Sequence, residues 1–233
     1  MTTKAVPRKH VFLGVLAFAI IALFAAQQLT DSGPPQNHAG FPWEVTVLES
    51  GHSQVFSLTL GQSTLAQAEN LFREVAELTL FSAEGSEPAV EAFFEEVKIA
   101  GLKSKMVMAI DIPQAQLNDM YDRGVRIATL GSGTRKVTLS SADAQTVRRM
   151  PITSITYLPA INLSAELVEK RFGQPAEKLA DPSSDAVHWL YPELGVDIAL
   201  SEENREVIQY VHPDSFTALV APLKQPVTDS TPQ

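Results

Sequence analysis

The feature that most constrains this chain is an uncharged, mostly apolar run of twenty residues, from Val11 to Thr30. Sixteen of these residues are apolar. A helix rises about 1.5 Å per residue, so twenty residues span roughly 30 Å, which is the thickness of the hydrocarbon core of a bilayer. We therefore expect residues 11–30 to form a transmembrane helix that anchors the chain in a lipid bilayer.

The charges on either side of this run predict its orientation. Lys4, Arg8 and Lys9 precede it, whereas the next basic residue after it is Arg73. Because basic residues accumulate on the cytoplasmic side of membrane helices, residues 1–10 should be cytoplasmic and the rest of the chain exported. This arrangement is typical of a bacterial inner-membrane protein whose bulk is periplasmic.

A cleaved signal peptide is the alternative, with Ala25-Ala26 as its small-residue exit. Cleavage there would place Phe24 or Leu23 three residues before the cut, where signal peptides carry a small residue. The pattern therefore favours an uncleaved anchor over a protein that is released and soluble in the periplasm. A lipoprotein anchor is excluded because the chain has no cysteine to carry the lipid.

Charge and cysteine content limit what the exported part can be. The formal net charge is −9 over the whole chain and +3 over its first ten residues, so the remainder carries about −12. Such an acidic domain lacks the basic surface that nucleic acids require, so we expect no nucleic-acid partner. Without disulfides its stability must come from a hydrophobic core, which about 190 residues can supply.

Proline, glycine and small polar residues mark the limits of the folded part. Residues 31–42 predict a flexible linker, and residues 222–233 a disordered tail. Between them we expect a first unit over residues 43–158 and a second over residues 159–221. Phe41-Pro42-Trp43 would anchor the linker to the domain.

Two segments one hundred residues apart resemble each other. Residues 64–72 and 164–172 both predict a helix that begins at a hydroxyl N-cap and ends on phenylalanine. Ala76-Glu77 matches Ala176-Glu177 at the same offset. The similarity suggests an internal duplication.

After the second helix, alternating apolar residues and polar turns predict three antiparallel strands, at residues 188–191, 196–200 and 207–211. In the first copy, residues 88–100 fit either a helix or a strand. The repeat favours a hairpin that turns near residues 102–104. It pairs Phe93-Phe94 with Leu190-Tyr191, and residues 97–100 with residues 196–199.

Between the two copies the pattern predicts a helix over residues 113–123 and a hairpin whose arms are residues 125–130 and 136–139. A further strand is expected at residues 152–158, which are rich in β-branched side chains. The predicted fold class is α+β, with two helix-plus-antiparallel-meander units and short helices packed on one face of the sheet.

A helix that ends on Phe172-Gly173-Gln174-Pro175 and is followed by a strand with Trp189 and Tyr191 resembles the SmpA/OmlA repeat of outer-membrane assembly lipoproteins. Ser164 and Val168 also match. The same helix-and-meander unit, duplicated, occurs in the β-lactamase inhibitory protein. The resemblance implies a non-catalytic module that binds other envelope proteins through its sheet face. Members of the first family usually carry a lipidated cysteine, which this chain lacks.

Candidate catalytic and metal-binding residues are few. The chain has no cysteine nucleophile and no G-x-S-x-G motif. His188 and His212, at strand ends, could approach each other with Asp185 or Asp214 nearby, but exposed histidines without a metal are the favoured interpretation. A glycosidase needs two acids that face one cleft, whereas adjacent acids in a strand point to opposite faces. We therefore interpret the acidic pairs of this chain as solvated surface residues: Glu95-Glu96, Glu202-Glu203 and Asp119 with Asp122. We predict no catalytic, metal or cofactor site.

Trp189 and Tyr191 are the candidate interaction residues, because they alternate onto one face of their strand while Leu190 takes the other. If that face is open, they form a contact patch of the kind enriched at interfaces. If helices cover both faces, they belong to the core.

Two functions follow from the sequence. The first is a single-pass, membrane-anchored periplasmic module that binds another envelope protein without catalysis. The second is a periplasmic hydrolase or small-ligand receptor whose Ser, Asp and His residues meet only in the fold. A pocket with convergent ionisable residues would favour the second, and an exposed aromatic-aliphatic sheet face the first.

Overall fold

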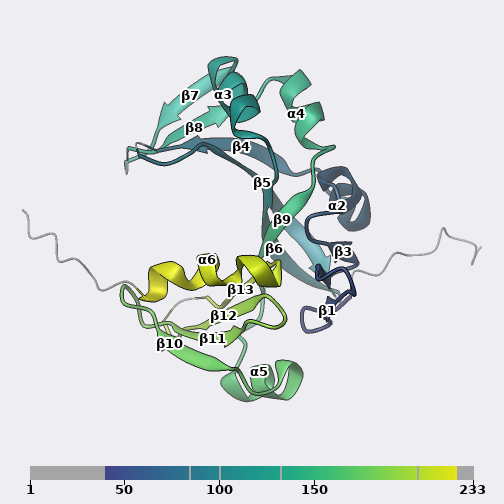
Figure 1. Cartoon of the computed structure of the whole chain (residues 1–233), viewed down its shortest axis with the longest axis vertical. Helices are drawn as coiled ribbons and strands as arrows, with labels where there is room; N and C mark the ends of the chain where they lie inside the picture. Colours follow the sequence, from purple (N-terminus) through teal and green to yellow (C-terminus); the bar gives the residue numbers. More distant parts are fainter. Residues whose placement is uncertain (1–39, 84, 100, 132, 204, 225–233) are drawn as a thin grey trace, which may run out of the picture. The chain divides into compact units, whose positions relative to one another are not determined.

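The computed structural model describes residues 40–83, 85–99, 101–131, 133–203 and 205–224 (Figure 1). Over these ranges no helix combines the length and the apolar character needed to cross a membrane. The predicted transmembrane segment, residues 11–30, lies outside them, as do residues 225–233 of the predicted tail.

A ten-stranded antiparallel sheet dominates the fold, so the α+β class is confirmed. Every neighbouring pair of strands in it is antiparallel. Across the sheet the strands lie in the order β10 (Glu177–Ala180), β11 (Val187–Tyr191), β12 (Val196–Leu200), β13 (Val207–Val211), β9 (Ile152–Leu158), β6 (Leu102–Ile110), β5 (Ala89–Ile99), β4 (Glu77–Ser82), β8 (Arg135–Thr138) and β7 (Arg126–Thr129).

Each half of the sheet follows a helix. Helix α5 (Ala165–Phe172) leads into the meander β10-β11-β12-β13, and helix α2 (Leu65–Phe72) leads into β4-β5-β6, beside which β9 lies. Between β6 and β9 the chain makes helix α3 (Gln114–Asp122), the β7-β8 hairpin and helix α4 (Ser141–Val147). The two halves meet where β9 pairs with β13.

The registers of the two halves correspond. Phe94 lies opposite Met106, which lies opposite Tyr157. Tyr191 lies opposite Val196, which in turn lies opposite Tyr210. The predicted match of Phe93-Phe94 with Leu190-Tyr191 therefore agrees with the pairing.

The predicted match of residues 97–100 with residues 196–199 is wrong. Residues 89–99 form a strand rather than a helix, but β5 runs on to Ile99 through an irregularity between Phe94 and Val97. The chain turns back at Gly101, not at 102–104, because Gly101 supplies the positive φ of the turn. The register therefore makes Met106, not Val97, the counterpart of Val196.

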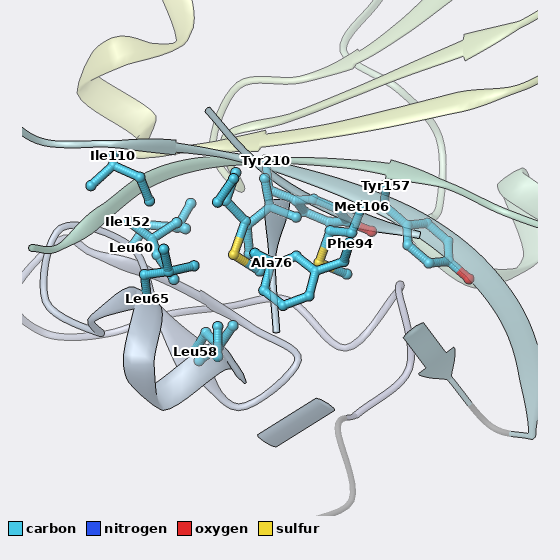
Figure 2. Close-up of a cluster of buried hydrophobic side chains, with 14 of the residues drawn as sticks. Leu58, Leu60, Leu65, Ala76, Phe94, Met106, Ile110, Ile152, Tyr157 and Tyr210 are labelled. Carbon is cyan, nitrogen blue, oxygen red and sulfur yellow. The ribbon is translucent and has the colours of Figure 1, made fainter. Parts of the chain in front are cut away.

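The hydrophobic core lies on one face of this sheet (Figure 2). Phe94, Met106 and Tyr210 are fully buried there. A small sheet of β1 (Thr46–Val47), β2 (Ser53–Val55) and β3 (Leu58–Thr59), in a segment without a sequence prediction, places Phe56 against both Tyr157 and Tyr210, with ring centroids 5.4 and 5.6 Å apart. Phe56 has a φ of 52°, a strained conformation for a bulky residue that its burial offsets.

The predicted helix starts are confirmed. The Thr64 side chain accepts a hydrogen bond from the backbone N–H of Gln67, whose own side chain accepts one from the Thr64 N–H, so both halves of a capping box form. Ser164 caps α5, and Gly173 ends it. The predicted helix at 113–123, hairpin at 125–139 and strand at 152–158 correspond to α3, β7-β8 and β9.

The expectation that helices pack on one face only is wrong. After β13 the chain forms a short 3-10 helix, Pro213–Ser215, then α6 (Phe216–Val220) and a second 3-10 helix, Ala221–Lys224. Phe216 and Val220 pack against Leu190 and Val211, in a cluster separate from the main core. Helix α6 therefore lies on the side of the sheet opposite that core (Figure 1). Residues 222–224, predicted to be disordered, are part of this helical segment.

Candidate binding face

The predicted contact residues Trp189 and Tyr191 are in the core. Trp189 is 5% exposed and Tyr191 6% exposed, and both pack in the main cluster near α5. The ring of Phe172 lies 5.8 Å from that of Tyr191, whose hydroxyl donates to the carbonyl of Gly173. The sequence left open whether the face of Trp189 and Tyr191 is exposed or covered by helices. It is covered, because α5 packs on their face and α6 packs on the face of Leu190.

A different part of the sheet presents apolar side chains without full burial. One row of directly opposed residues runs across it, on the side away from the main core, and contains Phe93, Val107 and Thr156, all half-buried. Because side chains alternate along a strand, the half-buried residues two positions away share this side. We call this surface the open sheet face: Phe81, Phe93, Val107, Ala109, Ser154 and Thr156.

Charged pairs border the aromatic part of the open sheet face. The Lys105 ammonium lies 2.7 Å from a carboxylate oxygen of Glu95 and 5.8 Å from the centroid of the Phe93 ring. Lys136 and Glu77 form a second pair at 3.0 Å. The face thus combines an apolar centre with a charged border, which is the composition of a protein-binding surface.

The corresponding positions of the other half are covered. The register makes Leu190 the counterpart of Phe93 and Asp197 the counterpart of Val107. Leu190 and Asp197 are each 2% exposed. The same sheet side is therefore accessible over β5, β6 and β9 and covered over β11 and β12.

A cluster of His188, Asp197 and Asp181 lies beside this covered side. A carboxylate oxygen of Asp197 lies 2.8 Å from Nδ1 of His188. This hydrogen bond raises the pKa of His188 above its usual range, against the opposing effect of burial. Asp181 lies 3.9 Å from Nε2 of His188, and its carboxylate accepts hydrogen bonds from Ser183 and Ser184, which lower its pKa.

This group does not have the geometry of a serine hydrolase. In a Ser-His-Asp triad the serine hydroxyl bonds the imidazole nitrogen that faces away from the carboxylate. Here that nitrogen faces a second carboxylate, Asp181, which holds the serines. The arrangement neutralises a buried carboxylate and fixes the loop after β10, so a structural role fits it best.

The possible approach of His188 to His212 does not occur, since His188 is bonded to Asp197. His212 instead lies against His52, with ring centroids 4.8 Å apart, and its Nδ1 accepts from the backbone N–H of Asp214. Asp185 accepts hydrogen bonds from the hydroxyl of Ser201. Among the described residues no cluster of three or more His or acidic side chains could hold a metal ion.

The acidic pairs considered for glycosidase chemistry are engaged elsewhere or exposed. Glu95 pairs with Lys105, and Glu96 with Lys103 at 2.7 Å. The Lys103 hydrogen bond lowers the pKa of Glu96, so Glu96 is not the proton-holding acid that this chemistry needs. Asp119, Asp122, Glu202 and Glu203 are exposed.

Neither the scan against models of protein families nor the searches of curated proteins and solved structures gives a match to this chain. The functional argument therefore depends on the surfaces of the molecule itself.

Proposed function

We propose that this protein is a single-pass, membrane-anchored periplasmic module of the non-catalytic, protein-binding type. Residues 11–30 would anchor it in the bacterial inner membrane with the N-terminus in the cytoplasm. The open sheet face would bind another envelope protein, in envelope assembly or maintenance. No catalytic step, cofactor or nucleic acid takes part in this function.

The observation that carries the proposal is the half-buried Phe93–Val107 pair at the centre of the open sheet face. Large apolar side chains at the centre of a charged border are the usual anchors of a protein interface. Phe81 extends the apolar surface along β4 on the same side.

The two halves of the sheet support the same proposal. We interpret α2-β4-β5-β6-β9 and α5-β10-β11-β12-β13 as two copies of one helix-and-meander unit, because their registers correspond position by position. This is the duplicated arrangement that the resemblance to the SmpA/OmlA repeat and the β-lactamase inhibitory protein implies. In both, the resemblance assigns binding to the sheet face.

Site-specific photocrosslinking in the membranes of the native host tests this function. A photoreactive amino acid in place of Phe93 or Val107 in the full chain should crosslink reproducibly to one envelope protein. The matched control is the same substitution at Val75, which is 73% exposed and lies outside the open sheet face. Crosslinking that is absent at both positions, or equal at Val75, would contradict the proposal.

The alternative, a periplasmic hydrolase, would have to use the His188–Asp197 pair, although Asp181 faces the other imidazole nitrogen. A serine-directed fluorophosphonate probe tests it: labelling of Ser183 or Ser184 that disappears in His188→Gln would support hydrolysis. Absence of labelling in the wild-type chain would leave the binding function.

A further inference from the structure

An apolar pocket lies on the core side of the molecule, away from the open sheet face. Its volume is about 190 Å³, somewhat larger than the roughly 150 Å³ of an engineered cavity that accommodates benzene. Helix α5 contributes Leu167 and Val168, and the end of β9 contributes Tyr157. The chain segments before β1 and after β9 close the remaining sides.

The mouth of this pocket is unusually apolar for an exposed surface. Phe41, Leu102 and Ile161 line the pocket, and they are 41%, 44% and 46% exposed. They are three of the nine large apolar side chains that are exposed in the described part of the chain. Exposed apolar side chains that gather around a pocket, rather than lying singly, indicate a binding site.

The lining excludes an occupant that needs several hydrogen bonds. Its polar side-chain groups are the Tyr157 hydroxyl, the Arg171 guanidinium and the indole N–H of Trp43. The Tyr157 hydroxyl is already bonded to the hydroxyl of Ser104 at 2.9 Å, and both residues are buried. A peptide segment would leave its N–H and C=O groups without partners here, whereas a hydrocarbon chain has no such groups.

Arg171 places one positive charge at this pocket. Its guanidinium lies 4.5 Å from the centroid of the Trp43 ring, which is itself stacked on Phe41 at 4.9 Å. Within the described ranges no carboxylate forms an ion pair with Arg171. A guanidinium held in place by an aromatic ring can bind a carboxylate or a phosphate.

The position of the pocket along the chain agrees with a lipid-like occupant. Residues 31–40 separate the predicted transmembrane segment from Phe41, and ten residues span at most about 35 Å. If residues 11–30 cross the membrane as proposed, the pocket lies within that distance of the bilayer surface. Amphiphiles that leave the bilayer would therefore reach it at high local concentration.

We infer that this pocket binds the hydrocarbon chain of an anionic amphiphile, with Arg171 bound to the anionic group. The chain would enter between Phe41, Leu102 and Ile161 and fill the cavity beside Leu167. A free fatty acid and an anionic phospholipid share this chemistry. The site is separate from the open sheet face and does not depend on what that face binds.

Photolabelling of the full chain in phosphatidylcholine nanodiscs tests the inference. One arm adds a fatty acid with a diazirine at the end of its chain, a second adds the corresponding fatty alcohol, and a third uses nanodiscs with diazirine-labelled phosphatidylglycerol. Mass spectrometry then locates the label. We expect it on pocket residues of α5 and residues 157–163, with the acid labelling about tenfold more than the alcohol because it adds a charge-assisted bond.

Two variants with matched controls make the result specific. Ala160 is exposed and lines the pocket, so Ala160→Trp should block the mouth without disturbing the fold and reduce labelling at least tenfold. The control Ala142→Trp places the same ring on exposed α4 and should change nothing. Arg171→Gln should lower the acid to the level of the alcohol, whereas Lys170→Gln, outside the pocket, should not.

The arms also identify the source of the chain. Pocket labelling by the free acid alone would assign a fatty acid, and labelling by phosphatidylglycerol would assign a membrane lipid. Labelling that Ala160→Trp does not reduce, or no label on pocket residues in either anionic arm, would overturn the inference. Crosslinks from this pocket to a protein chain only would also overturn it, while leaving the function of the open sheet face to its own test.

Discussion

The two halves of the sheet have corresponding registers but different surroundings on the side away from the main core. Phe93 and Val107 are half-buried, whereas their counterparts Leu190 and Asp197 are 2% exposed. The difference arises after the last strand of each half. Strand β13 continues into helix α6, which folds back on Leu190, whereas β9 continues toward α5 on the core side.

This comparison shows that a side chain covered by a helix needs partners that an exposed side chain does not need. Val107 needs no partner on an open face. Asp197, at the corresponding position beneath a cover, is a buried carboxylate that needs a compensating group, and His188 supplies it at 2.8 Å. Corresponding positions of the two halves are thus open in one half and stabilised beneath a cover in the other.

The largest expected effect separates the two sides of strand β5. Phe94 is fully buried in the main core, so Phe94→Ala should lower the free energy of unfolding by about 3–5 kcal/mol. Phe93→Ala, on the open sheet face, should cost less than about 1 kcal/mol. Urea denaturation of both variants measures the difference. Equal losses would show that the open sheet face is part of the core.

The second largest difference in stability is expected between the turns of the two central hairpins, β11-β12 and β5-β6. Gly195 and Gly101 both have a positive φ, of 69° and 82°. A Cβ at Gly195 would overlap the backbone carbonyl oxygen of Val211, whereas nothing lies within 4 Å of one at Gly101. Gly195→Ala should therefore cost about 3 kcal/mol and Gly101→Ala about 1 kcal/mol. Thermal unfolding of both variants checks this, and a larger loss at Gly101 would contradict it.

A smaller difference is expected between the corresponding tyrosines of β9 and β13. The buried Tyr210 hydroxyl donates to the carbonyl of Pro42, so Tyr210→Phe leaves a backbone acceptor unpaired and should cost about 1–3 kcal/mol. Tyr157 is bonded to the side chain of Ser104. The double variant Tyr157→Phe with Ser104→Ala removes both partners of this hydrogen bond. It should therefore lower the free energy of unfolding less than Tyr157→Phe alone, which denaturant unfolding measures. A larger loss in the double variant would refute this.

The smallest effect depends on pH and belongs to the covered half. Because Asp197 raises the pKa of His188 in the folded protein, the charged imidazole stabilises the fold below its unfolded pKa of about 6.5. This contribution is lost as the pH rises through the higher folded pKa. Unfolding of the wild type and His188→Gln should therefore differ more at pH 6 than at pH 9. A difference independent of pH would show that the imidazole acts only by packing.

Much of the local structure could be predicted from the sequence because its signals are local. Thr64 and Ser164 marked helix starts through their capping side chains, and alternation marked the strands of the meander after Trp189. The strand at residues 89–99 needed the comparison of the two repeats, since its apolar spacing also fits a helix. The turn after this strand was expected near residues 102–104 but lies earlier, because the β5-β6 pairing, not the local pattern, decides where that hairpin turns.

One repeated pattern was present in the sequence but went unused. Ile155-Thr156-Tyr157 and Ile208-Gln209-Tyr210 occupy corresponding positions in β9 and β13, where the two halves pair. This I-x-Y pattern would have strengthened the duplication and placed its junction. The contact of Phe56 with both tyrosines has no such signal, because a strained turn far away in sequence makes it.

The sequence by itself determined the chain's predicted membrane topology, its α+β class and the limits of most helices and strands. These depend on hydropathy, charge and the spacing of apolar residues along the chain. Only the tertiary structure decided that Trp189 is core, that Phe93 lies on an open face and that Arg171 stands at an apolar pocket. Alternation tells which residues share a face, but what covers that face depends on segments such as α6 that are distant in the chain.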